Sequence, residues 1–352
     1  MKTPDRVFAQ KKLLLLLVGA IPAALLLLFV WAGGWLTPER LSANTLIEVL
    51  EKNGGVHPGF RRNHAKGVCV SGEFISNGKA EALSRAIVFR PGSVPVTGRL
   101  AIAGGNPGAP DYAVPVRSFA LAFTLPDGQQ WRSGMNALPF FSVATPQGFY
   151  DQQLATRPLA ATGKPDPQKM QAFMQAHPEA KPFFQWAKTH VLAAGWAQEQ
   201  YNSLNAFRFI DAHNQNHFVR WSLVPHSPWQ PISAQDKEDK NYLAGDLKTR
   251  LAAGPLSWDL LITVARPGDP VNDATKAWPQ ENPSLVAGTV VIHKAEDQQG
   301  GACNNINYDP LILPDGIAGS DDPLLNARSA AYAKSFNLRT TEEARQGQEK
   351  RS

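Results

Sequence analysis

The sequence predicts an α+β protein built as a closed antiparallel β-barrel of eight strands, with inserted and C-terminal helices and one transmembrane helix in front. Three observations lead to this prediction. Short apolar segments rich in β-branched residues lie before and after one helical block, so strands and helices do not alternate. A long uncharged segment lies near the N-terminus. With 352 residues, 43% of them hydrophobic, the chain can bury a large core.

Seven segments have the apolar pattern of strands. In one of them, Phe119, Leu121 and Phe123 fall on a single face, because successive side chains of a strand point to opposite sides. Their number is close to the eight strands of a small closed barrel. The predicted strands are residues 67–74, 98–103, 116–125, 206–210, 218–223, 256–265 and 285–293.

Three helical segments are expected among these strands. Residues 166–198 carry apolar side chains at roughly helical spacing, and residues 234–251 repeat this pattern over a shorter length. A third helix is expected over residues 324–336, because the acidic residues and the proline just before it suit a first helical turn. The polar residues 340–352 are expected to fray.

Residues 13–33 carry no charge, and as a helix they would extend roughly 31 Å, about the thickness of a bilayer core. Basic residues precede this segment, so the positive-inside rule places the N-terminus in the cytoplasm and the later residues in the periplasm. We therefore expect an inner-membrane anchor in residues 1–36 and one compact domain in residues 37–352. A cleaved signal peptide is the alternative.

The charges and cysteines exclude some classes of protein. The net charge of +5 comes from 35 basic and 30 acidic residues spread along the chain, which argues against a dedicated nucleic-acid-binding protein. The only two cysteines, Cys69 and Cys303, are too few for a zinc module. In an oxidising compartment they can form one long-range disulfide, and two buried thiols are equally compatible with the sequence.

Two groups of residues could carry chemistry, although common catalytic signatures such as the P-loop are absent from the sequence. His64 lies just before an apolar strand, close to Arg61, where a structural histidine would also fit. Arg328 precedes Tyr332 by one helical turn, so both side chains project from the same face. A guanidinium beside a phenol favours the phenolate, a ligand of ferric iron. A stacked pair at a solvated helix face is the alternative.

In combination, these motifs resemble the haem catalase superfamily, and in particular its small, membrane-anchored catalase-related peroxidases. The resemblance covers residues 46–339. RRNHAKG, residues 61–67, is similar to the distal haem motif of the family. SGMNALPFFSVATPQGFY, residues 133–150, is similar to its second distal motif. RSAAYAKSFNLR, residues 328–339, is similar to the proximal motif, in which an arginine follows R-x-x-x-Y after seven residues.

The resemblance implies roles for eight residues around a haem b group. Tyr332 is implied to be the iron ligand, with Arg328 beside it on the same helix. His64 and Asn136 are implied to be catalytic residues above the haem. The other residues implied to bind the cofactor are Phe149, which stacks on the haem, and the propionate-binding Arg61, Arg99 and Arg339.

By the same resemblance, we expect a haem peroxidase that reduces hydrogen peroxide or organic hydroperoxides with a small organic electron donor, through a ferryl intermediate. Two departures from full-length catalases argue against efficient dismutation. Ala101 stands where they carry a serine that orients the distal histidine, and Asn63 stands where they usually carry an apolar residue. Catalase-type dismutation, rearrangement of fatty-acid hydroperoxides and haem binding without turnover are the alternatives.

Overall fold

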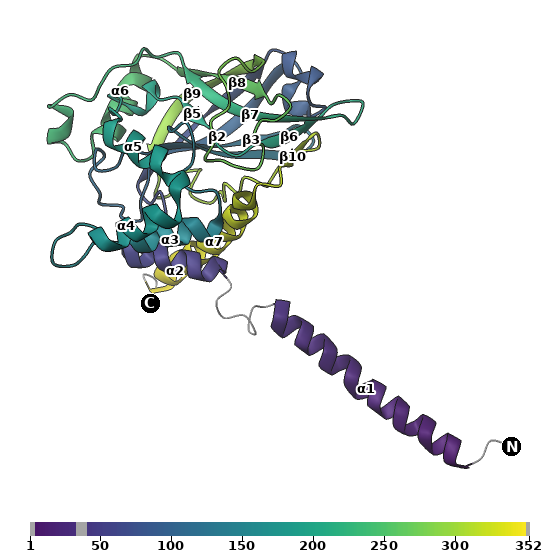
Figure 1. The fold of residues 1–352 in the computed structure, drawn as a ribbon. Helices are drawn as coiled ribbons and strands as arrows, with labels where there is room; N and C mark the ends of the chain where they lie inside the picture. The colour runs from purple at the N-terminus through teal and green to yellow at the C-terminus, as the bar shows by residue number, and fades with distance from the viewer. Residues whose placement is uncertain (1–3, 33–40, 350–352) are drawn as a thin grey trace. The chain divides into compact units, whose positions relative to one another are not determined.

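The computed structural model describes residues 4–32 and 41–349 (Figure 1). Contacts divide the chain into two units, Met1–Ser42 and Ala43–Ser352. The second unit contains every strand among the described residues and all of the residues that the sequence analysis assigns to the site.

The first unit contains one helix, α1 (Pro4–Ala32). A search of the residues that the structure describes finds no helix with both the length and the hydropathy needed to cross a bilayer. The expected boundary between residues 36 and 37 lies outside the described residues.

The second unit is built on a single sheet whose ten described strands run in the order β10-β6-β7-β5-β4-β3-β2-β1-β9-β8. All pairings are antiparallel, and an additional pairing between β7 and β8 closes the sheet. Eight strands therefore form a barrel, and β6 and β10 extend the sheet beside β7. The strands are β1 (Gly67–Ser76), β2 (Gly92–Ile102), β3 (Arg117–Thr124), β4 (Gln130–Asn136), β5 (Tyr201–Asn202), β6 (Phe207–Ile210), β7 (Asn216–Pro225), β8 (Leu256–Val264), β9 (Ser284–Asp297) and β10 (Ile317–Gly319).

The prediction of an eight-stranded antiparallel barrel with helices is confirmed, and all seven predicted strands are present. The sequence analysis missed β4, β5 and β10. In β4, Trp131, Ser133 and Met135 are buried, but the residues between them are polar or glycine, so the segment does not have a strongly apolar pattern. The strands β5 and β10 have only two and three residues, too few for a period of two to be visible.

The expected helix over residues 166–198 is wrong as one element, because prolines interrupt it. The first helix ends at Ala176 before Pro178, and a second begins at Lys181 just before Pro182. The helices of this unit are α2 (Ala43–Gly54), α3 (Pro146–Ala155), α4 (Pro167–Ala176), α5 (Lys181–Thr189), α6 (Tyr242–Ala253) and α7 (Pro323–Glu349). Short 3₁₀ turns are Lys79–Ala82, Ile87–Phe89, Pro178–Ala180, Trp196–Gln198 and Asp236–Glu238.

The other two helix predictions need smaller corrections. Helix α6 begins at Tyr242 instead of residue 234, because residues 233–241 are almost entirely polar and have no apolar face to bury. Helix α7 continues to Glu349, so the expectation of a frayed tail is wrong as far as that residue. Glu342 holds the added turns in place, because it pairs with the buried Arg62 and accepts a hydrogen bond from the Gly59 amide at 2.9 Å.

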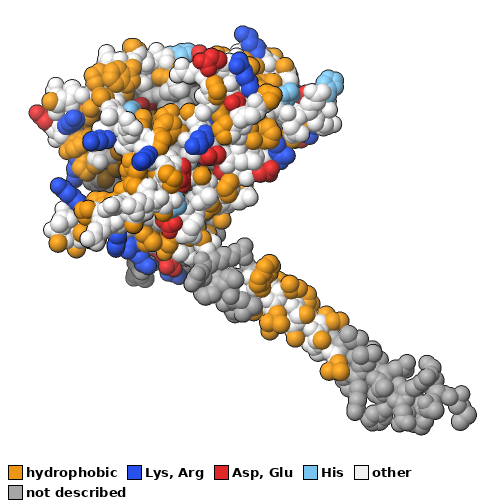
Figure 2. All heavy atoms as spheres, in the orientation of Figure 1, with side chains coloured by type: hydrophobic (Ala, Val, Ile, Leu, Met, Phe, Trp, Pro, Cys, Tyr) orange, Lys and Arg blue, Asp and Glu red, His pale blue; other side chains and the backbone are white. Residues whose placement is uncertain are grey.

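The barrel interior is a continuous apolar core dominated by aromatic rings. Trp131, Trp221 and Trp258 are almost completely buried, and Trp131 stacks on Phe123 with ring centroids 4.7 Å apart. The helices α2, α3, α4 and α7 gather on one side of the barrel (Figure 1). On the face drawn in Figure 2, the Lys and Arg side chains are scattered and do not form one stripe. Because side chains fill the barrel interior, a ligand-binding site is expected between the barrel and these helices.

Candidate active site

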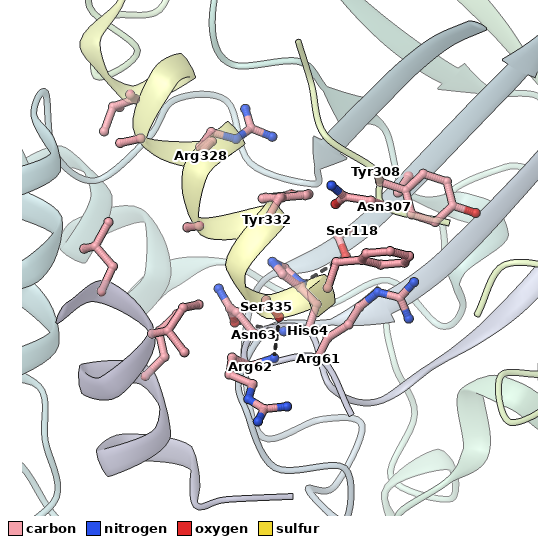
Figure 3. A pocket seen from close by; sticks show the side chains of 18 of the residues that line it. Arg61, Arg62, Asn63, His64, Ser118, Asn307, Tyr308, Arg328, Tyr332 and Ser335 are labelled. Carbon is pink, nitrogen blue, oxygen red and sulfur yellow. Dashed lines mark hydrogen bonds between the residues drawn. The ribbon is translucent and has the colours of Figure 1, made fainter. Parts of the chain in front are cut away.

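All eight side chains that the sequence analysis singled out line one cavity. Figure 3 labels Arg61, His64, Arg328 and Tyr332 among them. Residues of β2, β3, β4, α2, α3 and α7 contribute to its wall, and the volume open to the centre of a water molecule is about 220 Å³. The structure therefore brings together segments that are far apart in the sequence. The eight residues are Arg61, His64, Arg99, Asn136, Phe149, Arg328, Tyr332 and Arg339.

His64 reaches the cavity from the loop that precedes β1, and its ring is held by a residue that the sequence analysis missed. Ser118 Oγ on β3 lies 3.0 Å from His64 Nδ1, at hydrogen-bonding distance (Figure 3). Ser118 is the register partner of Ala101 on β2 and of Asn136 on β4. The hydroxyl that Ala101 cannot supply is thus supplied from the neighbouring strand, and Asn136 lies directly across from it.

The surroundings of His64 keep its imidazole neutral. Burial, together with the positive charges of Arg99 and Arg328, lowers the pKa of His64 from its ordinary value of 6.5 to about 3. A hydrogen bond with the backbone of Ile102 opposes this shift only partly. A neutral imidazole has one ring nitrogen with a lone pair, so His64 can accept a proton at neutral pH.

Tyr332 reaches the same cavity from the helix α7, one turn after Arg328. The Arg328 guanidinium lies 5.9 Å from the centre of the Tyr332 ring. It donates a hydrogen bond to the Gly134 carbonyl at 3.0 Å and another to the Asn205 side chain. A Cβ atom at Gly134 would lie 3.2 Å from both the Tyr332 hydroxyl and the Arg328 Nη2, so a larger residue there would crowd the pair. The barrel wall thus fixes the Arg328 side chain beside the Tyr332 ring.

Three arginines line the cavity close together: Arg61, Arg99 and Arg339. Burial, together with the positive charge of Arg339, lowers the pKa of Arg61 to about 10. Burial, and then the charge of Arg61, holds the pKa of Arg99 well below its ordinary value. Arg61 Nη1 and Arg339 Nε are buried and have no hydrogen-bond partner among the described residues. A cluster of this kind is incomplete until an anion joins it.

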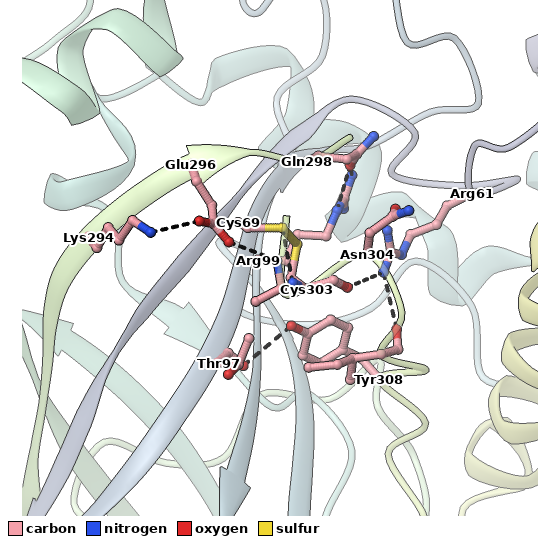
Figure 4. Close-up of a disulfide and its surroundings, with 12 residues drawn as sticks. Arg61, Cys69, Thr97, Arg99, Lys294, Glu296, Gln298, Cys303, Asn304 and Tyr308 are labelled. Carbon is pink, nitrogen blue, oxygen red and sulfur yellow. Dashed lines mark hydrogen bonds and ion pairs between the residues drawn. A yellow bond between two sulfur atoms is a disulfide. The ribbon is translucent and has the colours of Figure 1, made fainter. Parts of the chain in front are cut away.

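A disulfide between Cys69 and Cys303 supports the arginine cluster (Figure 4). This finding settles which of the two cysteine states the fold adopts. Arg61 Nη2 donates hydrogen bonds to the Cys303 carbonyl at 3.0 Å and to the Ile306 carbonyl at 3.1 Å. Arg339 Nη1 donates to Asn304 Oδ1 at 3.3 Å. The segment that follows Cys303 therefore holds two of the three arginines.

Arg99 has a role in the structure beyond the one that the sequence analysis gave it. Its Nη2 donates to the His64 carbonyl at 2.7 Å, and its Nε donates to Gln298 Oε1 at 2.8 Å. Gly67 makes room for this guanidinium, since a Cβ atom there would lie 2.8 Å from the Arg99 Nη2. Arg99 thus ties the His64 backbone to the barrel wall.

The rest of the cavity wall is largely apolar. Phe149 on α3 stacks with Phe141 at a centroid distance of 6.1 Å. Apolar side chains of the helix α2, among them Leu46, Ile47 and Leu50, line the cavity as well. An apolar wall together with a cluster of arginines suits an apolar group that carries carboxylates.

The sequence analysis missed several residues that complete the site. Ser118 was detectable only through its strand register with Ala101, which a single sequence does not reveal. The others are Asn205, Gln298, Asn304 and Tyr308, which lie in loops or next to strand ends and carry no motif of their own. Their positions in the site depend on contacts between segments that are far apart in the sequence.

The fold and the site together define a class: an eight-stranded antiparallel barrel with a cavity between its wall and flanking helices, into which a histidine and a tyrosine both point. The family model described as Catalase matches residues 38–346. The chain therefore belongs to the catalase family. The fold of this family implies a haem group, in agreement with the sequence analysis.

Two curated relatives cover nearly the whole chain. A catalase-related peroxidase of Synechococcus elongatus is 38% identical over 312 residues, which are 88% of this chain and 91% of that protein. A catalase-related peroxidase of Mycolicibacterium paratuberculosis is 34% identical over 313 residues, 88% of this chain and 96% of that protein.

Solved structures agree on the fold. A bacterial catalase superimposes with a TM-score of 0.72 at 23% identity over 80% of this chain. This chain spans only 58% of that catalase. Catalase A from Saccharomyces cerevisiae superimposes with a TM-score of 0.73 at 18% identity, over 80% of this chain and 62% of that chain.

Proposed function

We propose that this protein is a haem peroxidase that reduces hydrogen peroxide or organic hydroperoxides and oxidises a small organic donor. One observation carries the proposal. His64 and Tyr332, from opposite ends of the folded unit, line the same cavity as Arg61, Arg99 and Arg339, and buried N–H groups of Arg61 and Arg339 have no hydrogen-bond partner among the described residues. The names of the two relatives that cover nearly the whole chain support a peroxidase over the alternative activities.

The residues present fit a haem b group. The buried N–H groups of Arg61 and Arg339 need anionic acceptors, and propionate carboxylates would supply them with charge-assisted hydrogen bonds. The apolar wall around Phe149 suits the rest of a porphyrin. Tyr332 would ligate the iron through its phenolate oxygen, with the Arg328 guanidinium fixed beside its ring.

The haem would supply the redox chemistry, and the side chains of the chain would move the protons. The neutral His64 would accept a proton from the bound peroxide and return it to the departing oxygen. When His64 Nδ1 donates to Ser118 Oγ, the lone pair lies on Nε2, where a proton acceptor needs it. Asn136, across the sheet from Ser118, would donate a hydrogen bond to the peroxide. Arg328, held by its hydrogen bonds to Asn205 and Gly134, would place a positive charge beside the Tyr332 phenolate.

Peroxidase and dismutase turnover can be separated by assay. We expect rapid oxidation of a phenolic donor such as guaiacol with little oxygen evolution, because both relatives that cover nearly the whole chain are named catalase-related peroxidases and because the polar Asn63 lines the cavity beside His64. Substitution His64→Ala should lower the rate of peroxide reaction about 10² to 10⁴-fold while haem stays bound. Full peroxide activity in that variant would refute the proposal.

We also propose that residues 13–33 anchor the chain in the inner membrane, with the catalytic unit in the periplasm. This proposal rests on the uncharged length of that segment and on the basic residues before it. The disulfide between Cys69 and Cys303 supports it, because disulfides persist in oxidising compartments. A reporter enzyme fused after residue 352 should be active only in its periplasmic form. Extraction of the protein from membranes by alkaline carbonate would contradict the anchor.

A further inference from the structure

The backbone of His64 adopts an unusual conformation. Its φ angle is 54°, in the left-handed region that residues with a side chain rarely enter. A residue in this region stays there only when its surroundings hold it, and such residues cluster at functional sites. The contacts that hold His64 in place can therefore be part of the catalytic arrangement.

Asn63 supplies the contact to the His64 amide. Asn63 Oδ1 accepts two hydrogen bonds at 2.9 Å each, one from the His64 N–H and one from the Gly104 N–H. The Gly104 carbonyl in turn accepts a hydrogen bond from the Ala65 N–H at 2.9 Å. Two hydrogen bonds that run in opposite directions thus join the His64 loop to the turn after β2. Gly104 itself has φ = 106°, which suits a glycine.

The other contacts of His64 act on different atoms. Arg99 donates to its carbonyl, and Ser118 lies at hydrogen-bonding distance from Nδ1. Neither of them contacts the His64 N–H. An apolar side chain at position 63 could not accept the two N–H groups that Asn63 Oδ1 accepts.

We propose that Asn63 is a positioning residue for His64. Its side-chain oxygen holds the left-handed backbone of His64 and thereby sets the direction in which the imidazole enters the cavity. This inference rests on the proposed function, in which His64 is the proton acceptor. Because Asn63 lines the cavity beside His64, a small shift of this backbone would move the imidazole relative to the substrate.

The test compares Asn63→Leu with Asn63→Asp in the haem-loaded protein at pH 8. The aspartate keeps an acceptor oxygen, whereas the leucine has similar size and no acceptor. The first readout is the association rate of cyanide with the ferric haem, because hydrogen cyanide must give its proton to a nearby base as it binds. The second is the single-turnover rate with hydrogen peroxide. Haem content and melting temperature are measured on the same samples.

We expect N63L to slow both rates about 10 to 100-fold with haem content and melting temperature nearly unchanged, and N63D to restore most of the wild-type rate. A crystal structure of N63L should show His64 with a negative φ. Wild-type rates in N63L would overturn the inference. Slow rates that fall only in proportion to haem content, or that N63D does not restore, would also overturn it.

The variant His64→Ala separates this inference from the proposed function. If H64A keeps the wild-type peroxide rate, the proposed function fails, and the role of Asn63 fails with it. If H64A is slow and N63L is not, only the positioning role fails.

Discussion

Arg61 Nη2 donates a hydrogen bond to the Cys303 carbonyl at 3.0 Å, so a cavity arginine is fixed by a residue of the disulfide (Figure 4). Cys303 is almost completely buried and is attached to β1 through Cys69, 234 positions earlier in the chain. The Ile306 carbonyl, which accepts a second hydrogen bond from Arg61, lies in the same segment. The cross-link therefore connects the stability of the fold with the part of the cavity that would bind the haem carboxylates.

Removal of this cross-link should loosen the haem. In the double variant Cys69→Ser and Cys303→Ser, we expect faster haem release, because the segment that holds Arg61 is no longer attached to β1. The free energy of unfolding should fall by about 2 to 5 kcal/mol. Transfer of haem to excess apomyoglobin measures the release rate. Reductant should accelerate release from the wild type and leave the double variant unaffected, since the chain has only these two cysteines. Equal release rates in both proteins would contradict this prediction.

A serine on β2 should be able to replace Ser118 on β3 as the hydrogen-bond partner of His64. Substitution Ser118→Ala should lower the rate of peroxide reaction about 10 to 100-fold, because His64 Nδ1 loses its hydrogen-bond partner. Adding Ala101→Ser should restore much of that rate, since residues 101 and 118 are register partners on the same face of the sheet. Stopped-flow absorption measures both variants. A double variant as slow as the single one would show that the ring needs the oxygen on β3 itself.

His64 should also affect the dependence of stability on pH. Its pKa is lowered to about 3 in the folded protein, chiefly by burial, while the unfolded value is near 6.5. Between these values the unfolded chain binds more protons, so this group stabilises the fold fully above pH 6.5 and progressively less toward pH 3. Its contribution to the slope is at most about 1.4 kcal/mol per pH unit. Urea unfolding of the apoprotein should be less pH-dependent in His64→Gln. The same slope in both proteins would contradict the shift.

Loss of an arginine from the cluster should reduce the affinity for haem more than it reduces the stability of the apoprotein. Substitution Arg61→Met should weaken haem binding about 10 to 100-fold, the cost of about one charge-assisted hydrogen bond or more. The free energy of unfolding of the apoprotein should change less. The variant loses two hydrogen bonds to carbonyl groups, but it no longer buries the Arg61 charge or places that charge near Arg339. Haem titration and apoprotein unfolding measure the two effects. Unchanged haem affinity would show that Arg61 does not contact the cofactor.

Much of the fold and of the site could be predicted from the sequence. The strands with apolar alternation were predictable, because their pattern follows from burial on one face, as in residues 116–125. The motif residues were also predictable, because a spacing such as that from Arg328 to Tyr332 can be read directly from one sequence. The end of α7 was not, since the contact between Glu342 and Arg62 joins segments 280 positions apart.

The partners of the motif residues were hidden for the same reason. Ser118 is an ordinary serine in its own segment, and only the register of β2 and β3 brings it to His64. The disulfide could not be predicted with certainty either, because the sequence does not show the distance between the two cysteine Cα atoms. This distance is 5.2 Å in the fold.

Ligation of the haem iron by Tyr332 is central to the proposed function. The most direct measurement is the resonance Raman and absorption spectrum of the haem-loaded protein beside that of Tyr332→Phe. We expect a high-spin ferric haem with phenolate vibrations in the wild type and the loss of those vibrations in Y332F. A wild-type spectrum without phenolate vibrations, or one that Y332F leaves unchanged, would contradict this expectation.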